Sequence, residues 1–302
     1  MLFNSKKSTV IDTAEDSANG KWSAVFTGYY EDNYIIYFTG IRSQLLPHQN
    51  LGYYLRHIFV MKSAEKFYSM HGFESQVVVI GCGYDTLFWI LSDQNICFKK
   101  WFELDKEELI NKKAKIISDN AILYSATNQN DGFCLHKIDF NFSHSILNEL
   151  KQKNFDIHLP TLFIDEFSMI YFDPEKTQNI LKEIGNLKNS YLISYGMTLM
   201  DDEYGTFIKE GFEYINVPLK SYQLTATEDD YYKLLLNAGF EKAAVMNCNS
   251  MLKFFIDEND RKRIVRLEHF DNPREMLHYM RHYCAALGGN QEFVSVVPEV
   301  PK

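Results

Sequence analysis

The residues most able to do chemistry follow two apolar runs between positions 77 and 105. The first run ends in Gly81-Cys82-Gly83, and the second, Trp101-Phe102-Glu103-Leu104, ends in Asp105. Glycines after a buried strand let the backbone pass close to a ligand where a Cβ would clash. A carboxylate at the tip of the next strand can accept hydrogen bonds from both hydroxyls of a ribose. The pair therefore indicates a site for a nucleoside-containing cofactor.

The residue three positions after Gly83 separates two classes of such cofactor. Dinucleotide-binding turns have the pattern Gly-x-Gly-x-x-Gly, in which the third glycine lets the next helix pack beneath the pyrophosphate. The corresponding residue here is Thr86. S-adenosylmethionine (SAM) has no pyrophosphate and does not require that glycine. The sequence therefore favours SAM over a nicotinamide dinucleotide, and a dehydrogenase is the less favoured alternative.

Acidic residues also follow two later apolar runs. They are Asp139 and the pair Asp165-Glu166. Ligands of a parallel sheet bind at the carboxyl ends of its strands, so these acids should lie near Asp105. We expect Asp105 to bind the ribose and Asp139 to accept from the adenine amino group, with Phe140 packed on the ring. Glu166 is expected near the sulfonium or the amine of the methionine part.

Alternating apolar runs and helical patterns predict an α/β fold, a doubly wound, mostly parallel Rossmann-like sheet. Near-continuous apolar strands separated by helices are typical of a parallel sheet that is covered on both faces. The predicted strands are 76–80, 100–104, 133–138, 161–164 and 190–195, with a further strand at 242–247. The helices predicted between and after them are 85–91, 106–118, 143–151, 174–184, 201–211, 227–237, 258–268 and 273–287.

We expect a single domain over residues 1–302. Residues 1–20 are polar and are predicted to form a partly ordered tail, followed by a helical lid over 21–70. Within the lid, Asp32-Asn33 should cap a helix from Tyr34, Pro47 should interrupt it, and a second helix should span 51–68. Residues 71–250 form the Rossmann-like core, and 251–302 add C-terminal helices and a tail with one short strand.

Composition narrows the classes of partner. The net charge of −9 argues against nucleic acid, whose binding needs a basic face. No apolar run approaches the roughly 20 residues of a membrane span, and the first residues have no signal-peptide pattern. Five scattered cysteines without a CxxC pair indicate reduced thiols and no metal site. We therefore expect a cytoplasmic protein without membrane or nucleic-acid partners.

Several short motifs occur in order between residues 21 and 284. They are Lys21-Trp22-Ser23-Ala24-Val25, Gly28-Tyr29-Tyr30-Glu31-Asp32-Asn33-Tyr34-Ile35, Gly52-Tyr53-Tyr54-Leu55-Arg56, Gly81-Cys82-Gly83-Tyr84-Asp85-Thr86, Phe102-Glu103-Leu104-Asp105, Leu159-Pro160-Thr161-Leu162 with Glu166 and Tyr171, and Met280-Arg281-His282-Tyr283-Cys284. In this order and spacing the chain resembles the leucine carboxyl methyltransferases. These SAM-dependent enzymes methylate the C-terminal leucine carboxylate of the protein phosphatase 2A catalytic subunit.

The resemblance implies a class I SAM-dependent methyltransferase fold and a set of cofactor contacts. It assigns Lys21 and Arg56 to the methionine carboxylate of SAM, and an Arg fork suits that role. It assigns Gly81 to the methionyl and ribose region. It agrees with the residue-based roles of the remaining contacts, which are Asp105, Asp139, Phe140 and Glu166. The chain departs from the family pattern at Leu51, Gly196 and Phe167, on the acceptor side. The implied partner is the phosphatase tail, with a second contact to the folded phosphatase, and we expect a monomer.

Carboxyl methylation requires alignment more than acid–base chemistry. A C-terminal carboxylate has a pKa near ~3.5 and is already anionic at neutral pH, so no general base is needed. We therefore assign no catalytic residue, and none to the nine histidines, His282 included. Tyr171 and Tyr195 are candidates for positioning the acceptor and excluding water, as are the aromatic residues around Phe207 and Tyr222. Two alternatives stay open: an O-methyltransferase acting on a small molecule or a modified tRNA base, and a non-catalytic SAM-binding regulator of the phosphatase.

Overall fold

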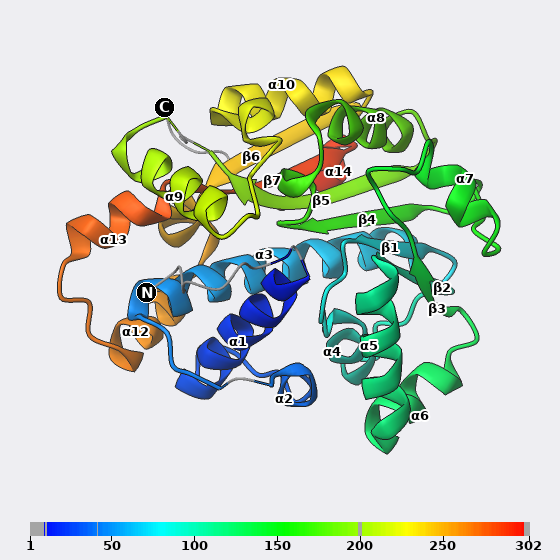
Figure 1. Ribbon diagram of the computed structural model, residues 1–302, viewed down its shortest axis with the longest axis horizontal. Coiled ribbons are helices and arrows are strands. Elements are labelled where there is room, and N and C mark those ends of the chain that lie inside the picture. Colours follow the sequence, from blue (N-terminus) through cyan, green and yellow to red (C-terminus); the bar gives the residue numbers. More distant parts are fainter. Residues whose placement is uncertain (1–8, 10, 41, 199–200, 299–302) are drawn as a thin grey trace.

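The computed structural model describes residues 9, 11–40, 42–198 and 201–298. Its centre is a seven-stranded sheet with the strand order β3-β2-β1-β4-β5-β7-β6 (Figure 1). The strands are β1 (Gln76–Ile80), β2 (Lys100–Asp105), β3 (Phe133–Lys137), β4 (Thr161–Glu166), β5 (Ser190–Met197), β6 (Lys242–Asn247) and β7 (Tyr283–Gly289). The first five strands run parallel, and β7 is antiparallel to both of its neighbours. The predicted doubly wound, mostly parallel α/β fold is confirmed.

The sheet is covered by helices on both faces because its strands are apolar on both sides. All five residues of β1 are buried, and they alternate between two hydrophobic clusters. Val77 and Val79 face one cluster, whereas Val78 and Ile80 face the other. This alternation explains why the strands read as continuous apolar runs in the sequence.

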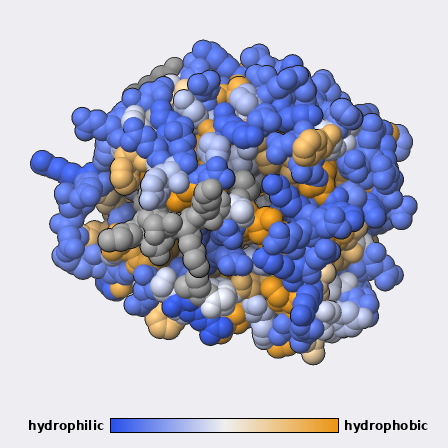
Figure 2. Space-filling model, in the orientation of Figure 1, coloured by the Kyte–Doolittle hydropathy of each residue, from blue (hydrophilic) through white to orange (hydrophobic). Residues whose placement is uncertain are grey.

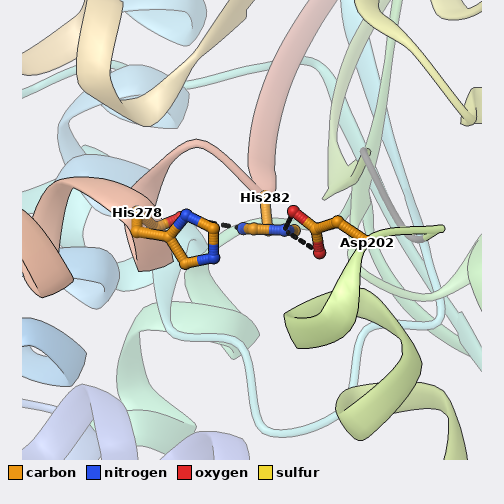
Figure 3. Close-up of side chains that lie close together, drawn as sticks. All are labelled: Asp202, His278 and His282. Carbon is orange, nitrogen blue, oxygen red and sulfur yellow. Dashed lines mark hydrogen bonds and ion pairs between the residues drawn. The ribbon is translucent and has the colours of Figure 1, made fainter.

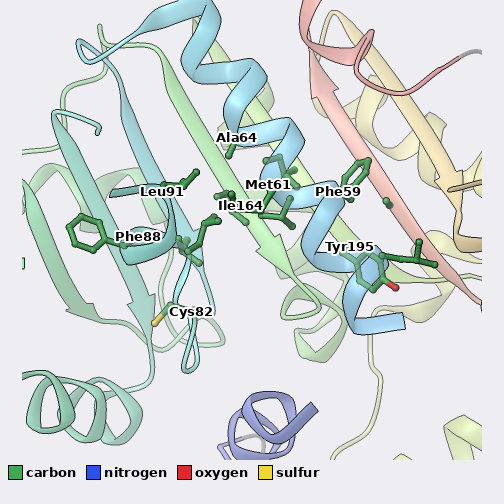
Figure 4. Packing of buried hydrophobic residues seen from close by; sticks show 14 of the residues in the cluster. Phe59, Met61, Ala64, Cys82, Phe88, Leu91, Ile164 and Tyr195 are labelled. Carbon is green, nitrogen blue, oxygen red and sulfur yellow. The ribbon is translucent and has the colours of Figure 1, made fainter. Parts of the chain in front are cut away.

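The first face packs against the N-terminal helices, the helices that follow β1 and β2, and two C-terminal helices. They are α1 (Asp12–Thr27), α2 (Ile35–Phe38), α3 (Pro47–His71), α4 (Leu87–Asp93), α5 (Glu107–Asp119), α6 (Ala121–Gln129), α12 (Glu258–Leu267) and α14 (Gln291–Val294). Figure 4 shows Phe59, Met61 and Ala64 of α3 beside Ile164 of β4. The long helix α3 therefore anchors the N-terminal segment on the core of the sheet.

The second face packs against three helices, and the remaining short elements surround the ends of β5 and β7. The three helices are α7 (Ile146–Lys151), α8 (Pro174–Gly185) and α10 (Glu228–Ala238). The remaining elements are η1 (Met169–Tyr171), α9 (Glu203–Tyr214), η2 (Tyr222–Thr225), α11 (Cys248–Ser250), η3 (Met251–Phe255) and α13 (Pro273–Met280). In Figure 2 the visible face is mostly hydrophilic, with hydrophobic residues in small separate groups. No helix in the described part of the chain is long and apolar enough to cross a membrane.

The structure gives the detail of the N-terminal segment. Residues 12–20, within the tail predicted to be partly ordered, belong to α1, and Gly20 lies so close to α3 that a Cβ would meet the Tyr53 ring. Residues 1–8 and 10 of that tail lie outside the described residues. Pro47 does not interrupt a helix but begins α3, because proline suits the first turn, where no amide hydrogen bond is needed. Asp32 caps α2 as predicted, since it accepts from the amides of Tyr34 and Ile35.

The largest error concerns residues 273–287, predicted as one helix. The helix ends at Met280, and the chain re-enters the sheet as β7 between β5 and β6. Alanines in 283–289 favour a helix locally, but this segment needs small residues to fit a crowded central strand. A Cβ on Gly288 would lie 2.8 Å from the Phe240 ring. A smaller difference is helix α6, which was not predicted.

Candidate active site

A cavity of about 580 Å³ lies at the carboxyl ends of the central parallel strands. Its volume falls within the range of about 300–1,000 Å³ that is typical of small-molecule sites. Eight of the residues predicted for cofactor binding or acceptor positioning line it: Lys21, Arg56, Gly81, Asp105, Phe140, Glu166, Tyr171 and Tyr195. The N-terminal helices α1 and α3 and the strand ends therefore converge on one cavity.

The glycine turn after β1 forms the floor of this cavity. Gly81 has φ +65°, and a Cβ there would lie 2.4 Å from the Cβ of Ser168. The Gly83 amide donates to Asp105 Oδ2 at 2.8 Å, so the end of β2 holds the turn. Burial raises the pKa of Asp105, although amides of Gly83 and Lys106 oppose this effect. The turn and the acid of the second strand are thus brought together as predicted.

Thr86, the residue that stands where a dinucleotide fold has glycine, ties the turn to the N-terminal segment. Its Oγ1 donates to Asp32 Oδ2 at 2.6 Å, and both side chains are buried. The same Asp32 caps α2 through its other oxygen. The threonine therefore has a structural contact of its own, which a glycine would lack.

Four charged side chains form a network at the centre of the cavity. Glu166 Oε2 lies 2.9 Å from Lys21 Nζ and 2.7 Å from Arg56 Nη2. Arg56 Nη2 also donates to the Glu166 carbonyl at 2.9 Å. Lys21 Nζ lies 2.8 Å from Asp85 Oδ2. Two cations from helices thus meet two acids from the strand ends, and the four formal charges sum to zero.

The network changes the ionisation of Glu166. Burial alone would raise the pKa of this carboxyl, but Arg56 and Lys21 hold it at about 2, below the ordinary value. Glu166 therefore carries a negative charge at neutral pH. An anionic ligand that drew Arg56 or Lys21 away would leave Glu166 to pair with a cationic group. The network is consequently suited to a zwitterion, such as the amino-acid end of a ligand.

The predicted adenine contacts behave differently from each other. Phe140 lines the cavity and stacks on Phe172 with ring centroids 4.6 Å apart. Asp139 is exposed and does not line the cavity, and its Oδ1 accepts from the Asn141 amide in a turn. The strand β3 ends at Lys137, so Asp139 lies two residues into the loop. The structure does not place Asp139 with the other predicted residues.

Aromatic residues form the rest of the wall. Tyr195 Oη lies 3.2 Å from Cys248 Sγ, and the Arg56 guanidinium lies 5.8 Å from the centre of its ring. The predicted wall residues Phe207 and Tyr222 do not line the cavity, and Phe207 is 56% exposed. Helix α9 instead contributes the neighbouring positions on its buried face. Further lining residues of this wall are Tyr53, Phe167, Ile208, Phe212, Ile215, Tyr279 and Tyr283.

Sequence reasoning missed the structural roles of Asp85 and Lys113. Asp85 stands in the same motif as the glycines, and besides Lys21 it binds the Leu87 amide at the start of α4. Lys113 of α5 is fully buried, with Nζ 2.6 Å from Glu103 Oε2 and 2.8 Å from the Asp85 carbonyl. The available signal was a lysine on the apolar face of a helix together with a glutamate inside an apolar strand, since buried charges are usually paired.

Asp202, His278 and His282 form a cluster next to the aromatic wall (Figure 3). The residue types could bind a metal ion, but hydrogen bonds already use the side chains of Asp202 and His282. His282 Nε2 lies 2.8 and 2.9 Å from the Asp202 oxygens, and Nδ1 lies 2.8 Å from the His278 carbonyl. Asp202 also pairs with Arg281 and caps α9 through Gly205. We interpret the cluster as a polar clamp that joins α9 to the start of β7.

The charge of the clamp is fixed by these contacts. Burial alone would raise the pKa of Asp202, but hydrogen bonds from Gly205, Arg281 and His282 hold it well below its ordinary value. The carboxylate therefore stays ionised across the neutral range. Arg281 and His282, to which we assigned no catalytic role, both pair with this carboxylate.

We expect the ionisation of His57 to make the stability of the protein depend on pH. Its ring stacks on Tyr30 with centroids 3.8 Å apart, and burial followed by the charge of Lys21 lowers its pKa from 6.5 to about 4. Folding therefore favours the neutral ring, so the full stabilisation is present above pH 6.5 and is lost as the pH falls towards 4. The measurement is the decrease in the free energy of urea unfolding when the pH is lowered from 7.5 to 5. This decrease should be about 1–2 kcal/mol smaller in His57→Phe than in the unmodified protein.

The matched control is His269→Phe, because the side chain of His269 is exposed. This variant should follow the unmodified protein at every pH. If His57→Phe and the unmodified protein lose the same stability on acidification, His57 does not titrate as described.

Comparisons with known proteins agree with the motifs and the fold. A family model described as leucine carboxyl methyltransferase matches residues 24–185. Leucine carboxyl methyltransferase 1 of Bos taurus is 27% identical over 301 residues, which cover 92% of this chain and 90% of that protein. The Caenorhabditis elegans protein of the same name is 25% identical over 294 residues, covering 90% and 88%. The resemblance drawn from the motifs is confirmed.

A second kind of relative and two solved structures complete the comparison. Human tRNA wybutosine-synthesizing protein 4 is 21% identical over 294 residues, which cover 91% of this chain but 43% of that protein. A putative methyltransferase from Thermobifida fusca superposes with a TM-score of 0.57 at 11% identity, covering 96% of this chain and 97% of that one. A DUF574 family protein from Streptomyces avermitilis gives a TM-score of 0.55 at 12% identity, covering 92% and 90%. These two structures support the fold alone.

Proposed function

We propose, because the chain belongs to the leucine carboxyl methyltransferase family, that it methylates the C-terminal leucine carboxylate of a protein phosphatase 2A catalytic subunit. The family makes the protein a SAM-dependent carboxyl methyltransferase. The choice of phosphatase and the roles of single residues are our proposal. The observation that carries the proposal is the Lys21–Glu166–Arg56 network beside the glycine turn in a cavity of about 580 Å³.

The residues in the cavity fit SAM. Gly81 lines the cavity with its backbone, and both its φ of +65° and the close approach of Ser168 require glycine there. Asp105 offers a carboxylate for the ribose hydroxyls, and Phe140 offers a ring face for adenine. Lys21 and Arg56 would hold the carboxylate of the methionine part, and Glu166 its ammonium group. Asp139 is not needed for this arrangement.

When bound, SAM supplies a methyl group that becomes the ester methyl, leaving S-adenosylhomocysteine and an acceptor without its carboxylate charge. The protein's own residues then have to orient the acceptor and exclude water. The described lining of the cavity contains no histidine. This agrees with an acceptor that is already ionised and needs no general base. Orientation of the two reactants can lower the activation barrier by as much as ~7–11 kcal/mol. Closely packed aromatic side chains in the wall are suited to hold the acceptor in that orientation.

Phenol groups are suited to holding the acceptor carboxylate. Tyr171, Tyr195 and Tyr283 line the same part of the cavity. Phenol O–H groups can donate hydrogen bonds to a carboxylate and carry no charge. A full positive charge at the same place would make the carboxylate a weaker nucleophile. Both central cations are already assigned to the carboxylate of the cofactor. We therefore assign the acceptor carboxylate to these hydroxyls, with Lys21 and Arg56 kept for the cofactor.

The test uses tritiated SAM with the phosphatase catalytic subunit. We expect base-labile methyl ester on the intact subunit and none on a subunit that lacks its terminal leucine. Gly81→Ala is the matched control. Its added Cβ would collide with Ser168 at the cofactor turn, so this variant should give no methyl ester on either subunit. Label that appears only on small molecules or RNA would contradict the proposal.

The relative that synthesises wybutosine supports a second candidate, a carboxyl or hydroxyl group on a modified tRNA base. The net charge of −9 disfavours it, since tRNA binding needs a basic surface. Bulk tRNA in the same labelling experiment separates the two candidates. A non-catalytic regulator would bind SAM in calorimetry with the phosphatase present and release no S-adenosylhomocysteine.

A further inference from the structure

Phe167 has a backbone conformation that is unusual for its residue type. Five non-glycine residues in the described part of the chain have positive φ, and four of them are asparagines. Asparagine tolerates the left-handed region, whereas an aromatic residue does not adopt it without a cost in free energy. Phe167 has φ +66°, directly after Glu166 at the end of β4. Its amide donates to the Tyr195 carbonyl at 2.8 Å, which holds it in place.

The conformation puts the ring on the wall of the cavity. Phe167 is half-buried, and its ring centroid lies 6.1 Å from that of Tyr171 and 6.2 Å from that of Tyr283. It also packs against a small hydrophobic cluster that includes Ile208 of α9. Strained residues cluster at sites where the strain serves a function. The strained Phe167 ring on the cavity wall is therefore a candidate for contact with a ligand.

The cavity has a charged part and an apolar part, and Phe167 lies where they meet. Glu166, the preceding residue, belongs to the network with Lys21 and Arg56. Ile208, Phe212 and Ile215 form the apolar part and offer no side-chain donor or acceptor. A nucleoside or an amino-acid end would leave its polar groups unpaired there. The apolar part fits a hydrocarbon side chain of the acceptor. Because Phe167 directly follows Glu166, that side chain would lie close to the methionine part of the cofactor.

We propose that Phe167 forms one wall of a pocket for the side chain of the acceptor's C-terminal residue and limits that residue to a branched aliphatic one. The proposal rests on the proposed methylation of a C-terminal leucine and adds the residue of this chain that selects among C-terminal side chains. The acceptor is a peptide tail with a medium-sized aliphatic end, and larger aromatic ends meet the Phe167 ring. Tyr171 and Tyr283 keep the ring in position through their ring contacts.

The experiment compares phosphatase tail peptides that differ only in the last residue, ending in leucine, methionine, phenylalanine or tryptophan. For the unmodified enzyme we expect kcat/KM for leucine to exceed that for phenylalanine by about 10- to 100-fold. Phe167→Ala should lower that ratio at least about tenfold, by admitting the aromatic ends. The dissociation constant for SAM, measured by calorimetry, should change less than about twofold, since no charged contact is lost.

Two further variants make the result specific. Phe167→Gly removes the same ring and also the backbone strain, so it should show the same selectivity and be at least as stable in urea as Phe167→Ala. Phe140→Ala, at the cofactor end, should raise KM for SAM and leave the ratio of leucine to phenylalanine unchanged. An unchanged ratio in both Phe167 variants would overturn the inference. An unmodified enzyme that binds SAM but methylates no tail would overturn the proposed function, and this inference with it.

Discussion

Lys113→Met should lower the free energy of unfolding by about 3–5 kcal/mol, because it leaves the buried Glu103 carboxylate without a cation, with only the Trp101 indole N–H as a donor among the described residues. Both side chains have no exposed surface, and Lys113 Nζ lies 2.6 Å from Glu103 Oε2. Burial alone would lower the pKa of Lys113, but the neighbouring Glu103 outweighs it and holds that pKa above the ordinary value. The lysine is therefore charged at neutral pH. Urea unfolding at pH 7.5 measures the loss.

Two variants show whether the loss comes from the charge. Lys112→Met removes the adjacent lysine, which is exposed and pairs with Glu108 at the surface, and should change stability by less than about 0.5 kcal/mol. The double variant Glu103→Leu with Lys113→Met removes both charges at similar volume and should recover most of the stability. A single Lys113→Met variant as stable as the unmodified protein would contradict the ion-pair interpretation.

The same lysine also holds the cofactor turn. Its Nζ donates to the Asp85 carbonyl at 2.8 Å, and the Asp85 side chain in turn binds Lys21. In the double variant the unfolding free energy recovers while the Asp85 carbonyl keeps no lysine partner. SAM affinity should therefore stay lower than in the unmodified protein even though stability returns. This separates the contribution of Lys113 to folding from its contribution to the site.

The parts of the fold that were predicted depend on short-range patterns. The strand at 76–80 and the glycine turn follow from a β-branched run that ends at Gly81, and the structure has the same bounds. The acid of the second strand could be placed beside the turn because parallel strands end at one edge. The helix predicted over 227–237 was likewise found, since its N-cap at Thr227 and its C-cap at Gly239 depend on neighbouring residues.

The parts that were missed depend on contacts between distant segments. Strand β7 lies between β5 and β6, and its small residues are required by the Phe240 ring, which no local pattern shows. Lys21 and Arg56 reach the cavity from helices, where most cations are exposed. The resemblance to a family identified them, whereas their spacing alone did not. Asp139 shows the opposite error, since it was predicted to bind the cofactor and does not line the cavity. The strand β3 ends one residue earlier than predicted, and Asp139 is exposed in the loop that follows.

Arg56→Ala should weaken SAM binding by about 1.5–3 kcal/mol, roughly 10- to 150-fold in the dissociation constant. The guanidinium makes two contacts with the Glu166 carboxylate and one with its carbonyl, and it is the group we assign to the cofactor carboxylate. Without it, Lys21 must balance both Glu166 and the incoming carboxylate. Calorimetry with SAM at pH 7.5 measures the change.

Arg56→Lys and Lys66→Ala test the reason for that loss. Lysine keeps the charge but cannot reproduce the planar fork, so Arg56→Lys should restore only part of the affinity. Lys66 lies on the same helix and pairs with Glu292 at the surface, and its removal should leave SAM affinity within about twofold. Affinity in Arg56→Ala equal to that in Lys66→Ala would mean that the cofactor carboxylate binds elsewhere. The cation–acid network at the centre of the cavity would then be structural, because its charges already balance without a ligand.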